Sequence, residues 1–145
     1  MARLGRESAQ RLGEGGTPSL LAARQIASIV ALVRDRYGLT ADAEVSLEAN
    51  PGPDERGDPA AQAGAGVTRV SYGAQALDDA TLRDLGRRHR ASDVADAVDG
   101  ARAAGIGSVN LDLLYDVPGG TLDGWMTTLE WALGFEPDLN TPNAW

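Results

Sequence analysis

The chain contains no cysteine and no lysine, and it has a single histidine, His89. The absence of cysteine excludes disulfide bonds, thiolate nucleophiles, and zinc or iron–sulfur sites ligated by cysteines of this chain. One histidine also excludes a metal site built from several imidazoles. Long apolar runs are absent too, since no stretch approaches the roughly 18 residues that a membrane-spanning helix requires.

The 145 residues carry 21 acidic side chains against 13 basic ones, all arginine, and 43% of them are hydrophobic. This length and composition predict one soluble globular domain with a modest core. The net charge of -8 argues against nonspecific binding to nucleic acid or to anionic membranes. Residues 1–6 lack the apolar stretch of a signal peptide, so the expected location is the cytoplasm. The oligomeric state stays open.

Apolar spacing and turn residues predict helices that alternate with strands. Strands are expected over residues 43–49, 67–73 and 108–115. Helices are expected from Leu20 to Tyr37, from Asp78, from a cap at Ser92, and from a cap at Thr121. The last helix carries a stripe predicted to be core, formed by Leu122, Trp125, Met126, Leu129 and Leu133. Residues 51–66 and 137–145 are expected to be irregular.

Strands that alternate with helices imply parallel pairing, and therefore an α/β layer or barrel. Three strands cannot close a barrel, because small barrels need about eight. The predicted fold class is therefore α/β with about three parallel strands and crossover helices, which form an incomplete structure.

Polar residues lie near the ends of all three expected strands. Glu48 and Asn50 end the first strand, Gln75 follows the second, and Asp112 lies within the third. In parallel α/β folds, ligands bind at the carboxyl ends of the strands. The glycine turn at residues 15–19 precedes a helix and offers free N–H groups to an anion. Taken singly, each feature also has a structural explanation, as a helix cap or a surface carboxylate.

Taken together, the motifs resemble those of one family. In chain order they are GGTPSLL at residues 15–21, EANPG at 48–52, GVTRVSYGAQ at 66–75, LGRRH at 85–89, NLDLLY at 110–115 and PGGTL at 118–122. These motifs resemble radical S-adenosylmethionine (SAM) proteins related to oxygen-independent coproporphyrinogen III oxidase. The EANPG and LGRRH versions are more similar to the HemW-type heme chaperone branch. The resemblance covers residues 14–138, a partial radical SAM core between an irregular segment at 1–13 and an irregular tail at 139–145.

The resemblance implies part of a (β/α)6 barrel whose mouth binds SAM beside a 4Fe–4S cluster, and a link to heme or porphyrin. By the same resemblance, Gly16 and Thr17 approach the methionine amino and carboxylate groups of SAM. Glu48 accepts a hydrogen bond from the amine, and Arg87 contacts the carboxylate. Further positions carried over by the family motifs are Gln75 and Asp112, which would bind the ribose or nearby polar groups. No residue is assigned a catalytic or metal-binding role.

Several departures from the family pattern bear on activity. Members of the family hold the cluster with a CxxxCxxC motif ahead of the GGTPS segment, and no cysteine is present here. Asp116 stands where a glycine is expected and Gly120 where a glutamine is usual, and residues 57–66 match poorly. The expected protein is a truncated or decayed fragment that cannot hold the cluster alone and is therefore inactive.

Three alternatives remain open. A non-catalytic binding module can derive from the same fold, with its open sheet edge and apolar helix faces covered by a partner. An acid–base enzyme can use Glu48 and Asp112 without any cofactor. The arginine-rich segment at residues 83–90 can bind a small anion or be a solvated helix face. Within it, His89 is expected to be a structural companion of the arginines rather than a ligand.

Overall fold

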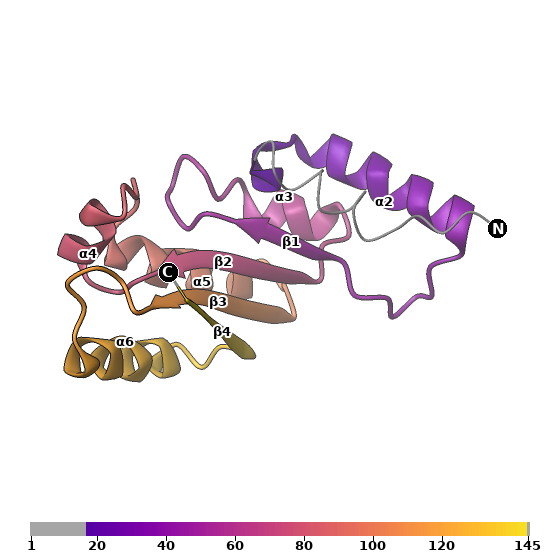
Figure 1. Ribbon diagram of the computed structural model, residues 1–145. Helices are drawn as coiled ribbons and strands as arrows, with labels where there is room; N and C mark the ends of the chain where they lie inside the picture. Colours follow the sequence, from indigo (N-terminus) through magenta and orange to yellow (C-terminus); the bar gives the residue numbers. More distant parts are fainter. Residues whose placement is uncertain (1–16, 145) are drawn as a thin grey trace.

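The computed structural model describes residues 17–144, and for 139–144 it describes the backbone alone. Within this range the chain forms one layer of four parallel strands and one layer of helices (Figure 1). The strand order β1-β2-β3-β4 follows the chain order. The predicted α/β class and parallel pairing are confirmed, with one strand more than expected.

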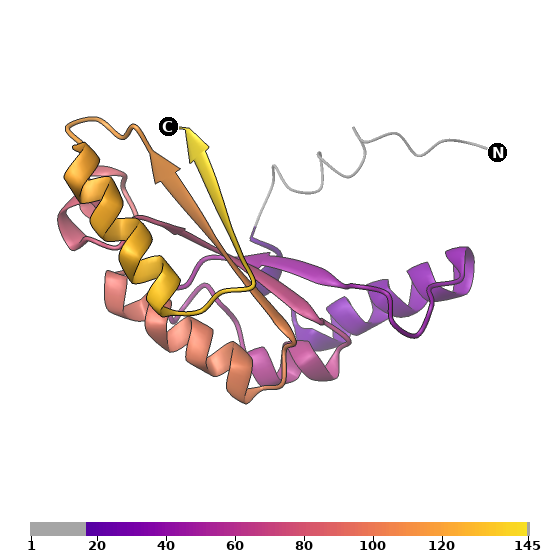
Figure 2. The ribbon, with the colours of Figure 1, turned by 90° about the horizontal axis from the view of Figure 1, so that it is seen from below.

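The elements in chain order are the short 3₁₀ turn η1 (Pro18–Leu20), α2 (Ala23–Tyr37), β1 (Ser46–Ala49), α3 (Pro59–Gly64), β2 (Arg69–Gln75), α4 (Asp79–Asp84), α5 (Ala91–Ala103), β3 (Ser108–Tyr115), α6 (Leu122–Gly134) and β4 (Leu139–Ala144). Each pair of neighbouring strands is connected through at least one helix. Figure 2 shows α3, α5 and α6 side by side along one face of the sheet.

The core lies between this helical layer and the sheet. The residues of α5 predicted to face inward, Val94, Ala97, Val98 and Ala101, are fully buried. They pack with alternate residues of β2 and β3, which include Val70, Tyr72, Val109, Leu111 and Leu113. Because side chains alternate across a strand, the residues between these project from the opposite face, which we call the inner face.

The first predicted helix begins later than expected. Residues 18–20 form the 3₁₀ turn η1, Leu21 is extended, and α2 starts at Ala23. The loop after β1 explains the interruption, since the Ser19 hydroxyl donates a hydrogen bond to the Glu55 carbonyl. A Cβ atom on Gly57 would lie 2.5 Å from the Ser19 carbonyl oxygen, so this loop lies directly against the turn.

Two further predictions about helices are wrong. Residues 51–66 are not wholly irregular, because Asp58 accepts a hydrogen bond from the Ala60 N–H at 3.0 Å and thereby begins α3. Proline at the next position fits the first turn of a helix. Helix α5 begins one residue before the predicted cap Ser92, and Asp93 instead accepts a hydrogen bond from the Arg90 N–H at 2.7 Å.

The predicted core stripe of α6 is only partly buried. Trp125 and Leu129 pack against the core, whereas Leu122, Met126 and Leu133 are 74%, 48% and 63% exposed. The 3.6-residue period places these three side chains on a lateral flank of α6. The amphipathic pattern therefore includes a flank that the described residues leave uncovered.

The expected irregular tail is wrong as well, because residues 139–144 form strand β4 beside β3. Turn-forming residues obscured this strand, since the segment contains asparagines and Pro142. A proline removes a backbone donor and is tolerated at the edge of a sheet. Asp138 and Arg102 hold the segment just before this strand in place. The Arg102 guanidinium donates hydrogen bonds to the carbonyls of Phe135 and Glu136 in that segment. The irregular segment predicted at residues 1–13 lies outside the described residues.

Candidate functional site

A row of polar residues crosses the inner face of the sheet. Glu48, Ser71 and Asn110 are register partners on β1, β2 and β3. Asp112 lies two residues beyond Asn110 and therefore on the same face. The structure thus brings the predicted site residues Glu48 and Asp112 to one surface. Sequence reasoning missed Ser71 and Asn110, although both occupy alternate positions of apolar strands.

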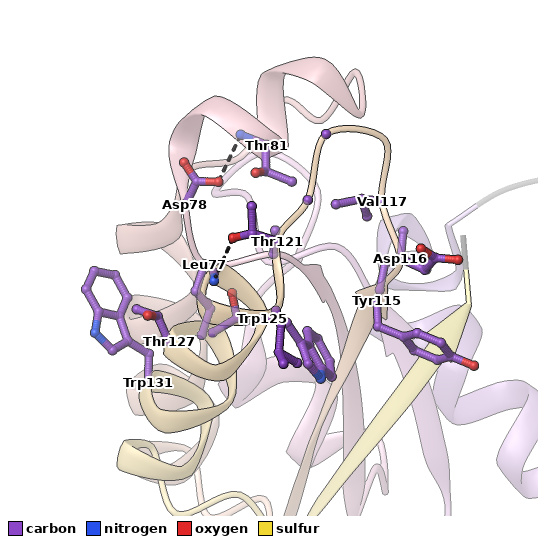
Figure 3. Close-up of a pocket in the computed structure, with 17 residues that line it drawn as sticks. Leu77, Asp78, Thr81, Tyr115, Asp116, Val117, Thr121, Trp125, Thr127 and Trp131 are labelled. Carbon is purple, nitrogen blue, oxygen red and sulfur yellow. Dashed lines mark hydrogen bonds between the residues drawn. The ribbon is translucent and has the colours of Figure 1, made fainter.

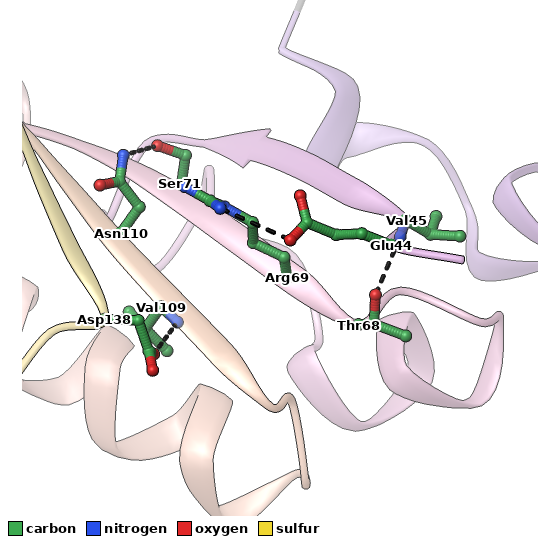
Figure 4. A network of polar contacts seen from close by, with 8 residues as sticks. All are labelled: Glu44, Val45, Thr68, Arg69, Ser71, Val109, Asn110 and Asp138. Carbon is green, nitrogen blue, oxygen red and sulfur yellow. Dashed lines mark hydrogen bonds and ion pairs between the residues drawn. The ribbon is translucent and has the colours of Figure 1, made fainter. Parts of the chain in front are cut away.

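Asp112, Ser71 and Asn110 form a closed hydrogen-bond cluster. The Ser71 hydroxyl donates to Asp112 Oδ2 at 2.8 Å. Asn110 Nδ2 donates to Asp112 Oδ1 at 2.9 Å and to Ser71 Oγ at 2.6 Å. Figure 4 shows the Asn110–Ser71 bond between neighbouring strands. Asn110 and Ser71 are buried and Asp112 is half-buried, so the cluster has a fixed geometry.

Glu48 differs from Asp112 in its surroundings. Its side chain is exposed, and no described side chain or backbone group forms a hydrogen bond or ion pair with it. Its carboxylate is therefore available to a ligand on the inner face. Two acidic groups, one fixed by neighbours and one available, accordingly lie on adjoining parts of the same surface.

Gln75, the last residue of β2, lies at the carboxyl end of this surface. Its backbone has φ +64°, in the left-handed region that residues other than glycine adopt infrequently. A Cβ atom placed on Gly73 would lie 2.8 Å from Gln75 Nε2 and 3.5 Å from Asn50 Oδ1. The side chains of Gln75 and Asn50 therefore both lie close to the space that a Gly73 side chain would fill, and Gln75 leaves no room for one.

Arg87 lies next to Asn50 in a polar cavity of about 280 Å³, together with Glu55, Arg88 and His89. This cavity is lined by the loop after β1 and by the segment between α4 and α5. A guanidinium in a polar cavity is suited to a carboxylate or another anion. Glu48 and Asp112 thus lie on the inner face of the sheet, whereas Arg87 lines this cavity. Gln75 stands at the carboxyl end of β2.

His89 fixes the position of the segment that carries Arg87. It is only 4% exposed, and its Nε2 forms a hydrogen bond of 3.1 Å with the Ala74 carbonyl oxygen. Burial lowers the pKa of His89, and the charge of Arg87 adds to the effect, whereas the Ala74 bond, Asp93 and Glu55 oppose it. The imidazole is therefore held as a structural group, and its Nε2 atom is not available to a metal or heme iron.

Thr17 stands at the start of the three-residue turn η1, which contacts β1. The long helix expected at this point begins only at Ala23, so Thr17 does not lie at the amino terminus of an extended helix. Gly16, the other residue assigned to the methionine end of SAM, lies outside the described residues.

A larger cavity, of about 610 Å³, lies apart from these predicted residues (Figure 3). It is lined by the loops after β2 and β3 and by one flank of α6, and its aromatic residues are Tyr115, Trp125 and Trp131. Asp78, which lines this cavity, already caps the amino terminus of α4 with its side chain. The hydrogen bond from the Thr81 side chain lowers the pKa of Asp78. Sequence reasoning did not find this cavity, since it assigned Trp125 to the core and gave Trp131 no role.

The sequence profile of the radical SAM superfamily matches residues 12–132. The chain belongs to this family. The heme chaperone HemW of Haemophilus influenzae is 37% identical over 123 residues, which are 85% of this chain and 32% of that protein. The mitochondrial radical S-adenosyl methionine domain-containing protein 1 of Mus musculus is 41% identical over 116 residues, 80% of this chain and 26% of the relative.

A solved structure extends the radical SAM relationship to the fold. Coproporphyrinogen III oxidase (HemN) from Escherichia coli, described as a radical SAM enzyme, superimposes with a TM-score of 0.75 and 29% sequence identity. The match covers 88% of this chain and 30% of that one. The chain thus spans about a third or less of the radical SAM relatives that it matches. It has the architecture of part of a radical SAM barrel.

The residues present do not fit the family's iron–sulfur cluster. Clusters of this type are held by cysteine thiolates, and the 145 residues contain none. Over residues 17–144, no group of three or more His, Cys, Asp or Glu side chains is arranged to hold a metal ion. In the same part of the chain, no helix has the length and apolar character needed to cross a membrane.

Proposed function

We propose that the inner face of this sheet is the SAM-binding surface of a HemW-like radical SAM protein connected with heme or porphyrin. The polar row of Glu48, Ser71 and Asn110, continued by Asp112, supports the proposal most strongly. On this face the carboxylates of Glu48 and Asp112 are the acceptors that the hydroxyl and ammonium groups of SAM require. Membership in the radical SAM superfamily gives the ligand its identity.

The proposed residue roles follow the family motifs. Glu48 accepts from the SAM ammonium group, and Asp112 and Gln75 bind the ribose or its neighbouring polar groups. Arg87 pairs with the methionine carboxylate from the polar cavity beside Asn50. Gly16 and Thr17 contribute at the methionine end, and Thr17 does so without the dipole of an extended helix.

The 145 residues alone are expected to bind SAM but not to cleave it. SAM cleavage to a radical needs an electron from a 4Fe–4S cluster, and no thiolate of this chain can ligate one. Anaerobic incubation with ferrous iron and sulfide is therefore expected to give no defined cluster signal in absorption or electron paramagnetic resonance spectra. A stoichiometric cluster on the purified chain would contradict the proposed inactivity.

Equilibrium binding measures the proposed function directly. Titration of the chain with SAM is expected to give saturable binding, and Glu48→Gln is expected to weaken it at least fivefold because the amide carries no charge. Glu130→Gln, which changes an exposed carboxylate of α6, is the matched control and leaves affinity unchanged. Absence of SAM binding to the folded wild-type chain would overturn the proposal.

A binding module is the second candidate function. It is favoured by the uncovered apolar flank of α6, formed by Leu122, Met126 and Leu133, and by strand β4 at the edge of the described sheet. A stable homo-oligomer in size-exclusion chromatography, with slow hydrogen exchange along β4, would support the module. Rapid exchange throughout the chain, together with aggregation, would instead indicate a fragment that does not fold alone.

A further inference from the structure

The hydrogen bonds of the inner-face cluster all lead to Asp112. Asn110 Nδ2 uses one hydrogen for Asp112 Oδ1 and the other for Ser71 Oγ. Ser71 in turn gives its only hydroxyl hydrogen to Asp112 Oδ2. The opposite orientation of the Asn110 amide would bring two acceptor oxygens face to face, so the donor directions are determined.

These hydrogen bonds determine which ligand groups the Asp112 carboxylate can bind. A carboxylate has about four lone-pair positions, and two are occupied by Asn110 and Ser71. The remaining positions accept hydrogen bonds, and neither neighbour has a spare hydrogen to offer a ligand. The cluster therefore favours ligands that bring hydroxyl or amino donors, and it disfavours phosphate or carboxylate groups at this point.

We propose that Ser71 and Asn110 are positioning residues that orient Asp112 to accept hydrogen bonds from the hydroxyl groups of a bound nucleoside. The inference rests on the proposed function of the inner face in SAM binding, and it adds the two neighbours that fix the carboxylate. Holding Asp112 in place before the ligand arrives reduces the conformational entropy lost on binding.

The position of the cluster in the sheet gives the proposal its structural basis. Ser71 and Asn110 are direct register partners on adjacent strands, so the backbone ladder fixes their separation. Asn110 is 3% exposed and Ser71 is 8% exposed, whereas Asp112 retains access to solvent. Rigid donors behind a partly accessible acceptor form the arrangement expected of residues that support a binding group.

The test compares adenosine with 2′,3′-dideoxyadenosine, which lacks both ribose hydroxyls, by NMR titration of the full chain. The wild-type chain is expected to prefer adenosine by about tenfold. Ser71→Ala and Asn110→Ala are expected to reduce this preference to about twofold while leaving the affinity for the dideoxynucleoside unchanged. Ser71→Thr keeps the hydroxyl donor and is expected to retain the preference.

The controls separate positioning from general damage. Ser92→Ala removes an exposed hydroxyl from α5 and is expected to behave as wild type. A variant that merely loosens the fold would weaken both ligands equally, and that outcome would overturn the positioning role. Wild-type preference retained in both alanine variants would overturn it too, with SAM binding still standing. A folded wild-type chain that binds neither SAM nor adenosine would overturn the proposed function and this inference together.

Discussion

Val109 and Asp138 exchange two hydrogen bonds that join the start of β3 to the residue before β4. The Asp138 N–H donates to the Val109 carbonyl at 2.9 Å, and the Val109 N–H donates to Asp138 Oδ2 at 2.8 Å (Figure 4). Asp138 therefore provides hydrogen-bond partners for both backbone groups of the buried Val109, with its own N–H for the carbonyl and its carboxylate for the N–H. The pairing sets the register in which β4 joins the sheet.

Asp138→Ala is expected to lower the free energy of unfolding by about 1–3 kcal/mol, because the buried Val109 N–H loses its acceptor. Denaturant titration measures the change, and hydrogen exchange should show β4 opening before β3. Asp99→Ala, an exposed change on α5, is the control and should alter stability by less than about 0.5 kcal/mol. Equal stability of the two variants would show that the Asp138 side chain contributes nothing.

Tyr72→Phe is expected to stabilise the protein by up to about 1 kcal/mol. The Tyr72 hydroxyl is buried, and no described group forms a hydrogen bond with it, so folding removes it from water without compensation. Denaturant unfolding at neutral pH measures the difference. A loss of more than about 1 kcal/mol in the phenylalanine variant would reveal a partner for the hydroxyl.

The same tyrosine predicts an alkaline limit to stability. Burial raises the pKa of Tyr72 to about 12, although the charge of Arg56 opposes the shift. Because the folded state retains the proton longer than the unfolded state, the free energy of unfolding falls as pH rises from about 10 to 12, by about 2–3 kcal/mol. Unfolding curves across this range should show the fall in wild type, and Tyr72→Phe should lack it.

His89 predicts a pH dependence at the acidic end. Burial lowers its pKa from 6.5, so the unfolded state binds the proton more readily than the folded state. The contribution of neutral His89 is fully present above pH 6.5 and is lost as pH falls through the lowered value. His89→Gln keeps a side chain able to bond to the Ala74 carbonyl and should have a shallower acid profile between pH 7 and 5. Identical profiles would exclude His89 as the titrating group.

The uncovered flank of α6 predicts a solution property. Replacing Leu122, Met126 and Leu133 together by glutamine should reduce self-association without lowering stability, since all three side chains are largely exposed. Light scattering and denaturant unfolding measure the two effects. Leu129→Gln, on the same helix but against the core, should instead destabilise the protein. Unchanged association of the triple variant would count against the α6 flank as a docking surface.

Much of the fold can be predicted from local sequence signals. The residues 108–115 predict β3 at its full length, and the α5 residues Val94, Ala97, Val98 and Ala101 are buried as their spacing indicates. Helix α3 was missed because nearby glycines and prolines outweighed the cap formed by Asp58. Strand β4 was missed because its pairing depends on Asp138 and Arg102, whose partners lie 29 or more residues away in the chain.

The candidate site, like the fold, could be predicted only in part from the sequence. Strand ends and family motifs predicted Glu48 and Asp112, which the structure places on the inner face of the sheet. They also predicted Gln75 and Arg87, which lie at the end of β2 and in the polar cavity. Ser71 and Asn110 have no motif signal of their own, since a serine or asparagine on a strand is commonplace. Their proposed role arises from register, and register is a relation between strands that the linear sequence does not display.

Gln75 carries a cost that bears on how this sheet can be improved. Its left-handed backbone costs of order 1 kcal/mol in a residue with a Cβ atom, and a glycine there would avoid most of it. Gln75→Gly would thus be selected in any search for a more stable chain, and it would remove the side chain that lies over Gly73. Stability and the proposed ligand recognition compete at this one residue, so a thermostabilised variant of this protein should be checked for binding first at position 75.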